Sequence, residues 1–399
     1  MPAMLKRIQH VIGRALAKTL SYLFILPVLY LIEPFWRIRL THLWVARFGP
    51  LAYNTHVFVG TRILEGPEPR TTRLFFGARP ANQPLFTMWK RILPIIENPI
   101  LSAFYHYAGP TLSKTRFFRP LPNNYHDHRP LNVGPVLSFS KAEEERGQSL
   151  LRDMGLTPDD WFVVFQSRDA SFHAQTGLGD SGTHRLCSID GFMAAAGEIT
   201  RRGGYAIRIG AGLNTPLPEN GNSRIIDYAT RFRRDWADIY LLGKCRFLLA
   251  PGTGTVFVPG LFGRPVAQSN MLPYIPNPMG RHSLYTTKLL KDARTGRILN
   301  FAELYEMGAF NFFHPHEAML RFPRELDEYG LIAVDNDEEE ILGLCLDMIA
   351  QLDGNPVNPE AARLQRLYKT QFLNQATDID LIPDLAPSFA LKYRYLIEA

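Results

Sequence analysis

The sequence has few cysteines and lacks the motifs of several large enzyme classes. Its 399 residues include only Cys187, Cys245 and Cys345, which are odd in number and far apart. This set excludes a disulfide framework and a cysteine-based zinc site, and it favours a reducing cytoplasm. The chain has no Gly-x4-Gly-Lys-Ser/Thr loop, no Gly-x-Ser-x-Gly elbow and no His-Glu-x-x-His pair, and Gly210-Ala211-Gly212 lacks the third glycine of a dinucleotide fingerprint. P-loop kinases, serine hydrolases and zincin proteases are therefore excluded.

Excess charge is absent from most of the chain. The formal net charge is +6, and residues 1–47 alone account for it, with seven Lys or Arg against Glu33. The rest is balanced, which argues against a nucleic-acid surface and for a local anionic partner such as lipid. A hydrophobic share of 46% is enough for the two cores that this length suggests.

A long uncharged run is also lacking at the N-terminus. Leu20–Ile32 is thirteen residues without charge, and a membrane-spanning helix needs about 20. The run ends at Glu33-Pro34 without a small-residue cleavage site. We expect residues 1–39 to form an uncleaved helix in the membrane interface, which would make the protein peripheral on the inner face of the cytoplasmic membrane. The alternative is a helix packed on the protein's own body.

Alternating strand and helix patterns predict an α/β fold in two domains. Residues 40–135 are expected to form the first domain, with strands at 43–46 and 73–77 and a helix or turn starting at 51–56. In the connection to the second domain, His126-Asp127-His128 has no identifiable third ligand, so we expect a solvated loop and no metal site.

The pattern is stronger in residues 136–352, which we expect to form a Rossmann-like domain. Ser140 and Glu143 make a capping box that opens a helix over 141–154. Further strands are expected at 161–166, 205–209, 247–250 and 265–268, and further helices at 190–202, 235–243 and 338–352. Residues 353–399 are expected to be a C-terminal helical tail.

A small-residue loop comes directly after one of these strands. The apolar run 247–250 stops at Pro251, and Gly252, Thr253, Gly254 and Thr255 come next. We expect a helix to open there, so that its free N–H groups and the threonine hydroxyls bind a phosphate. A structural Gly-rich turn is the alternative, because a short Gly-x-Gly pattern is weak.

Charged residues come after the other strands of this domain. Arg168-Asp169 ends the first strand, where an arginine can grip a diphosphate and a carboxylate can accept a proton. His184-Arg185 and Arg208 occupy comparable positions, although a surface ion pair would explain Arg168-Asp169 equally well. The segment 169–182, with Gly177, Gly179 and Gly182, is typical of a loop that closes over substrate.

Several short strings lie in order along residues 43–350, among them Arg47-Phe48-Gly49, Met88-Trp89-Lys90-Arg91, Arg168-Asp169, Ile225-Ile226-Asp227-Tyr228-Ala229 and Asp238-Ile239-Tyr240-Leu241. Together they resemble a bacterial family of glycosyltransferases associated with surface-polysaccharide genes. This resemblance implies that 40–135 is the acceptor-side domain and 136–352 the nucleotide-sugar-binding domain. The helix, strand and Pro-Gly-Thr-Gly loop are similar to heptosyltransferases, and Arg168-Asp169 to fucosyltransferases. The resemblance implies a GT-B-like fold, in which two Rossmann-like domains face each other across a cleft and the second binds most of the nucleotide sugar.

One departure from that family affects the catalytic base. The family usually has Gly-His where this chain has Gly49-Pro50, and proline cannot accept a proton. Asp169, His184 or His56 remain as candidate bases. The resulting expectation is a metal-independent transferase without cofactor that moves a sugar from a nucleotide-sugar donor to a surface glycan, glycolipid or protein. The alternatives are an epimerase or hydrolase of the same fold, or a non-catalytic scaffold of a polysaccharide assembly.

Overall fold

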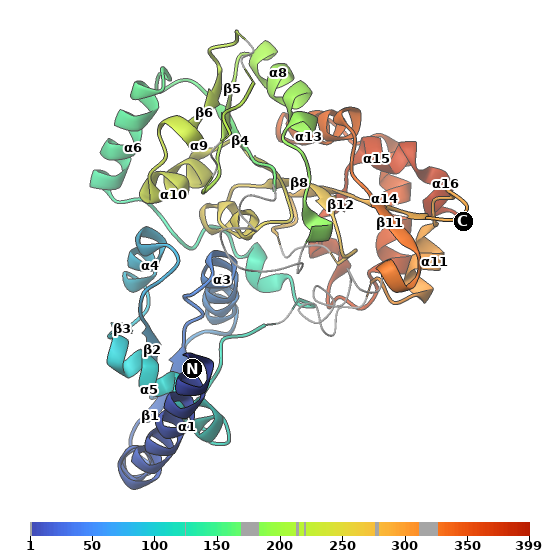
Figure 1. Ribbon diagram of the computed structural model, residues 1–399. Helices are drawn as coiled ribbons and strands as arrows, with labels where there is room; N and C mark the ends of the chain where they lie inside the picture. Colours follow the sequence, from blue (N-terminus) through green and yellow to red (C-terminus); the bar gives the residue numbers. More distant parts are fainter. Residues whose placement is uncertain are drawn as a thin grey trace. The chain divides into compact units, whose positions relative to one another are not determined.

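The computed structural model describes residues 2–123, 125–168, 183–212, 215–218, 221–275, 279–310 and 326–399, with side chains from residue 11 onward in the first helix and without the Thr183 side chain. The chain divides into two compact units, Met1–Asn123 and Asn124–Ala399, called unit 1 and unit 2 below. Figure 1 labels their elements.

Unit 1 begins with one continuous helical stretch and continues as a small α/β unit. The stretch comprises α1 (Pro2–Leu20), the π-helical turn η1 (Ser21–Ile25) and α2 (Leu26–Ile32). The strands β1 (Arg37–His42), β2 (Thr71–Gly77) and β3 (Ile95–Glu97) form a parallel sheet in that order. The other helices are α3 (Phe48–Glu65), α4 (Gln83–Lys90) and α5 (Pro99–Leu112). The strand expected at 43–46 is therefore wrong, because the sheet pairs the preceding residues.

Unit 2 is built on a seven-stranded parallel sheet in the order β12-β9-β8-β7-β4-β5-β6. Its strands are β4 (Phe162–Phe165), β5 (Tyr205–Arg208), β6 (Ile225–Asp227), β7 (Leu248–Pro251), β8 (Val266–Met271), β9 (Leu284–Thr287) and β12 (Asp384–Leu385). A separate antiparallel pair consists of β10 (Leu289–Asp292) and β11 (Leu331–Val334). β4, β7 and β8 are buried along their whole length. This burial explains the continuous apolar sequence of β4 and β7, whereas β8 also contains the buried polar residues Gln268, Ser269 and Asn270.

Helices cover the sheet of unit 2. They are α6 (Lys141–Asp153), α8 (Met193–Arg201), α9 (Tyr228–Arg231), α10 (Asp235–Lys244), α11 (Phe301–Glu306), α13 (Glu338–Leu352), α14 (Pro359–Phe372), α15 (Pro387–Lys392) and α16 (Arg394–Ile397). Short 3-10 turns lie at Arg129–Asn132, Thr183–Arg185, Asp190–Phe192 and Ile379–Leu381. The capping box of Ser140 and Glu143 is present at the start of α6.

The C-terminal residues are part of the core of unit 2. Leu364 and Tyr368 of α14 and Phe389 and Ala390 of α15 are buried in the same cluster as strand residues of the sheet. β12 adds the last strand beside β9. Both units are thus parallel α/β structures and unit 1 begins with an apolar helix, which confirms the expected α/β fold class with an N-terminal apolar helix.

Candidate functional site

The sheet of unit 2 changes winding direction beside β4. From β4 the chain adds β5 and β6 on one side, and then returns to place β7, β8 and β9 on the other. In open parallel sheets, ligands bind beyond the carboxyl ends of the strands at such a switch point. Arg168 lies just after β4 and Gly252 just after β7. The two segments that the sequence singled out for anion binding therefore flank one switch point.

Side chains join these two strand ends directly. Arg168 Nη1 donates to the Gly252 carbonyl oxygen at 3.4 Å, and Thr255 Oγ1 donates to Gln166 Oε1 at 2.8 Å. The hydroxyls of Thr253 and Thr255 are hydrogen-bonded to each other. Burial lowers the pKa of Arg168 from its ordinary value, because a charged guanidinium loses hydration there. An anion at this edge would restore favourable interactions to that charge.

The expected short helix does begin in the Gly252–Thr255 loop, but it is 3-10 in type. Two four-residue 3-10 turns, η5 (Gly254–Phe257) and η6 (Pro259–Phe262), follow the strand end. Pro259 has no N–H to donate to the preceding turn, which disfavours a longer α-helix through it. Turns this short have too few aligned peptides for the expected helix dipole. Binding therefore has to rely on the guanidinium, the hydroxyls and local backbone N–H groups.

His184 and Arg185 return to the same edge. They lie in the 3-10 turn Thr183–Arg185, two or three residues before Cys187, which pairs with Arg168 in an isolated antiparallel bridge. The Cys187 N–H donates to the Arg168 carbonyl at 3.0 Å, and the buried Lys288 ammonium donates to the Leu186 carbonyl at 2.8 Å. His184 is buried and Arg185 is partly exposed. Asp169 and the expected closing loop 169–182 lie outside the described residues.

Arg208 is placed differently from Arg168. Its buried guanidinium contacts Asp227 Oδ2 at 3.4 Å and the Thr215 carbonyl at 2.9 Å. The same Asp227 oxygen accepts from the Leu217 N–H and the Thr230 hydroxyl. The Arg208 charge is thus already compensated on the β5–β6 side of β4. A charge inside this strand needs a partner or a ligand, and the structure supplies Asp227 as the partner.

His56 and His128 are both buried and neutral. His56 lies in α3, its Nε2 has no hydrogen-bond partner among the described residues, and burial lowers its pKa to about 4. Burial also lowers the pKa of His128 to about 4. A group with so low a pKa is a weak proton acceptor at neutral pH, which disfavours His56 as the base. Gly49 and Pro50 lie in the first turn of α3, where proline is tolerated.

Within the described ranges, no group of three or more His, Cys, Asp or Glu could hold a metal ion. Asp127 is held by Arg129 through contacts of 2.8 and 2.7 Å.

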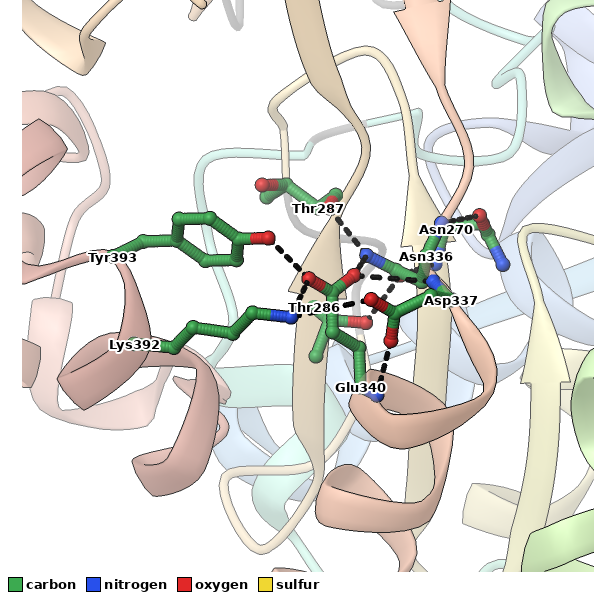
Figure 2. A network of polar contacts seen from close by, with 8 residues as sticks. All are labelled: Asn270, Thr286, Thr287, Asn336, Asp337, Glu340, Lys392 and Tyr393. Atoms are coloured by element: carbon green, nitrogen blue, oxygen red, sulfur yellow. Dashed lines mark hydrogen bonds and ion pairs between the residues drawn. The ribbon is translucent and has the colours of Figure 1, made fainter.

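A polar network fixes the strand end next to the loop (Figure 2). Asn270 has a φ of 54° at the end of β8, beside β7 in the sheet. Its backbone N–H donates to Asn336 Oδ1 at 2.7 Å, and the Asn336 N–H donates to Asn270 Oδ1 at 2.8 Å. Glu340 accepts from Asn336 Nδ2 at 3.0 Å and from Lys392 at 2.7 Å. No sequence signal pointed to this network, because its members are far apart in the chain.

Comparisons with known proteins give two likenesses of fold. No family model matches the sequence, and no curated protein matches it. Among solved structures, the ADP-heptose LPS heptosyltransferase II of E. coli superposes with a TM-score of 0.42 and 13% identity over 63% of this chain and 91% of that one. A glycosyl transferase family 9 protein of Veillonella parvula gives a TM-score of 0.48 and 11% identity over 79% of this chain and 98% of that one. Both are glycosyltransferases by name, but TM-scores below 0.5 carry no argument.

Proposed function

We propose that this protein is a glycosyltransferase that uses a nucleotide-sugar donor. The observation that carries the proposal is the pairing of Arg168 with the Gly252–Thr255 loop at the switch point of the sheet, where Arg168 Nη1 lies 3.4 Å from the Gly252 oxygen. A partly buried arginine beside small residues and two hydroxyls suits a diphosphate, which needs charge neutralisation and close backbone approach.

The reaction would break the bond between the anomeric carbon and the diphosphate. An acceptor hydroxyl oxygen bonds to that carbon, its proton passes to a base, and the nucleoside diphosphate leaves with the electron pair. Arg168, Arg185 and the Gly252–Thr255 loop would stabilise the charge that develops on the leaving group. Arg208 would contribute at longer range, since Asp227 already compensates its charge. Asp169 and His184 are the candidate bases.

The proposal extends to partners and place. The acceptor would be a surface glycan, a glycolipid or a protein, and the enzyme would work peripherally on the inner face of the cytoplasmic membrane, with no nucleic-acid partner. No cofactor is required by this scheme, and the guanidinium groups would take the part that a divalent metal plays in other transferases. Addition of EDTA should therefore leave the rate unchanged.

Incubation of the protein with a panel of sugar nucleotides, with and without lipid and glycan acceptors, tests the proposal. Release of nucleoside diphosphate only when acceptor is present would support transfer. Interconversion of the sugar would favour an epimerase, and release of nucleoside diphosphate without acceptor would favour a hydrolase. Both of these enzymes also need to bind the diphosphate. Absence of nucleotide binding across the panel would leave the scaffold alternative and contradict the proposed function.

A further inference from the structure

The N-terminal helical stretch is part of the body of unit 1. Ala17, Leu26 and Leu29 are buried in a cluster with Tyr105, Ala108 and Leu112 of α5 and with Phe117. The two helices approach closely, since a Cβ at Gly13 would lie 3.1 Å from the Tyr107 ring. At the far end, Trp36 Nε1 donates to Thr72 Oγ1 at 2.8 Å and Glu33 pairs with Arg39. One side of the stretch is therefore fixed to unit 1 from residue 13 to residue 36.

The other side carries large apolar side chains that are exposed. We call this set the apolar ridge, and it comprises Leu16, Leu23, Phe24, Val28, Leu31 and Phe35. Phe24, Val28 and Leu31 are spaced at intervals of four and three residues, so they share one helix face opposite the buried Leu26 and Leu29. Leu31 is 75% exposed and Phe35 77%. An exposed apolar surface of this extent on a soluble protein usually marks an interaction site.

Basic residues lie on the same helix as the apolar ridge but on another face. Arg14 and Lys18 are exposed and four residues apart on α1. With 100° per residue, they lie on one flank of the buried row through Gly13 and Ala17, and Leu16 of the apolar ridge lies on the other flank. A helix with exposed apolar and exposed basic residues on separate faces matches the interface of an anionic bilayer, in which apolar side chains reach the acyl chains and the cations attract phosphate headgroups. A second copy of this chain would repel these cations rather than attract them.

The packing of the helix on unit 1 bears on whether the helix spans a membrane or lies in the membrane plane. Within the described residues, Val11–Ile32 is the helix long and apolar enough to cross a membrane, although a signal sequence or a core helix meets the same criteria. The uncharged run of thirteen residues is too short to span a membrane, but the continuous helix of 22 residues is long enough. Length therefore does not exclude a span. A span would require Ala17, Leu26 and Leu29 to leave the core of unit 1.

We infer that the apolar ridge is a docking surface for an anionic lipid bilayer, in which the helix lies in the membrane plane with unit 1 still packed on its other side. The inference deepens the peripheral membrane location proposed above by giving it a surface and an orientation. It uses no residue of unit 2, so its failure would leave the proposed transfer reaction unaffected. Deletion of residues 1–39 would not isolate this surface, because it would expose the core of unit 1 as well as remove the apolar ridge.

Flotation of the full-length protein with vesicles of phosphatidylglycerol and phosphatidylethanolamine tests the surface. We expect Leu31→Ser with Phe35→Ser to weaken binding by about tenfold or more, because two mostly exposed side chains lose their transfer to lipid. The matched control is Ile332→Ser with Tyr395→Ser, which changes two exposed side chains of unit 2 and should bind as wild type does. Circular dichroism confirms that each variant is folded.

The basic row is tested separately. Arg14→Gln and Lys18→Gln should each weaken binding to anionic vesicles by about fivefold and leave binding to neutral phosphatidylcholine unchanged. Equal binding of the ridge variant and wild type would overturn the inference. So would a dimer of the wild type that the ridge substitutions dissociate while vesicle binding persists, because the occupant would then be a second copy.

Orientation is read from labelling in sealed vesicles to which protein is added from outside. The native cysteines are all buried, so Val11→Cys and Arg37→Cys, at exposed positions outside the apolar ridge, can each be labelled with an impermeant maleimide against a low background. Both sites should react from the outside, because an in-plane helix keeps its two ends on one side. Protection of either site until detergent is added would show a spanning helix and overturn the in-plane orientation.

Discussion

Arg168 differs from the other arginines of unit 2 in its position at the switch point of the sheet. Arg168→Lys keeps the charge and removes the planar fork that contacts the Gly252 carbonyl. We expect the affinity for the cognate nucleoside diphosphate, measured by calorimetry, to fall by roughly ten- to a hundredfold, as loss of a charge-assisted bidentate contact implies.

Arg264 is the matched control for this change. Its Nε donates to the Gly243 carbonyl at 3.3 Å, a contact like that of Arg168, but it precedes β8 and so lies at the amino edge of the sheet. Arg264→Lys should bind nucleotide as wild type does. If Arg168→Lys is also folded and binds like wild type, the nucleotide site lies elsewhere.

The unfolding free energy should depend on pH through one buried carboxyl group, that of Asp238. Burial raises the pKa of Asp238 to about 6, against the opposing effect of Arg233, which lies 3.0 Å away. A folded-state pKa above the unfolded value favours folding when the group is protonated, so this contribution is complete below about pH 4 and is lost as pH rises through 6.

Between pH 7 and pH 4 the wild type should therefore gain about 2–3 kcal/mol of unfolding free energy relative to Asp238→Asn. Urea unfolding of both proteins at several pH values measures this difference. Arg233 keeps Asp235 at 2.8 Å in the variant, so no charge is left without a partner. Parallel pH profiles for the two proteins would contradict the raised pKa.

The close packing of α6 against α10 in unit 2 requires a residue without a side chain at Gly147. A Cβ at Gly147 of α6 would lie 2.1–2.3 Å from three ring carbons of Tyr240 of α10. That ring is buried and lies against Phe139 with centroids 5.0 Å apart, so it has little room to move. Gly147→Ala should lower the unfolding free energy by about 2 kcal/mol or more, as overpacking does.

Gly197→Ala on α8 is the control, since a Cβ there meets no atom within 4 Å. Alanine is the better helix former, so this variant should gain up to about 1 kcal/mol. Thermal unfolding of both variants separates the two effects. A Gly147→Ala protein as stable as wild type would show that α6 and α10 do not pack as closely as the structure has them.

The sequence predicts elements well where the signal is local. The capping box of α6 and the apolar runs of α13 and β4 are each complete within a few residues, and the expected bounds of these elements agree with the structure within two residues. The expected position of β1 is wrong by several residues because its own sequence, Arg37–His42, alternates charge with apolar residues. Its pairing comes from segments distant in the sequence, β2 and Phe118. The helix expected at Gly252–Thr255 is present only as 3-10 turns, because Pro259 interrupts it and keeps the segment short.

The residues of the candidate site also divide into those that local sequence identifies and those that it does not. Gly252–Thr255 and Arg168 are identifiable because small residues and a charge come directly after apolar runs. Gln166, Asp227 and the pair of Asn270 and Asn336 are not, because their roles come from contacts over 19 to 89 positions of sequence. The strand order that places Arg168 beside Gly252 is also a tertiary property, and it is what turns two separate patterns into one site.

For the chain as a whole, the two inferred surfaces lie in different units, and hydrogen exchange can separate them. A nucleoside diphosphate at about 100 times its dissociation constant should stabilise its site by about 2.7 kcal/mol. Slower exchange is therefore expected in the peptides that contain 162–168 and 248–258. Anionic vesicles without nucleotide should instead slow exchange between residues 11 and 36, where lipid would exclude water from the helix that carries the apolar ridge.

Each ligand is the control for the other in this experiment. If nucleotide slows exchange in unit 1 alone, the donor site does not lie in unit 2, and the proposed chemistry is contradicted. Vesicle protection confined to unit 2 would contradict the docking surface and leave the chemistry untouched. Protection of both segments by nucleotide alone would mean that donor binding stabilises unit 1 as well. In that case the Arg168→Lys protein should lose both effects together, because the same diphosphate contact would produce them.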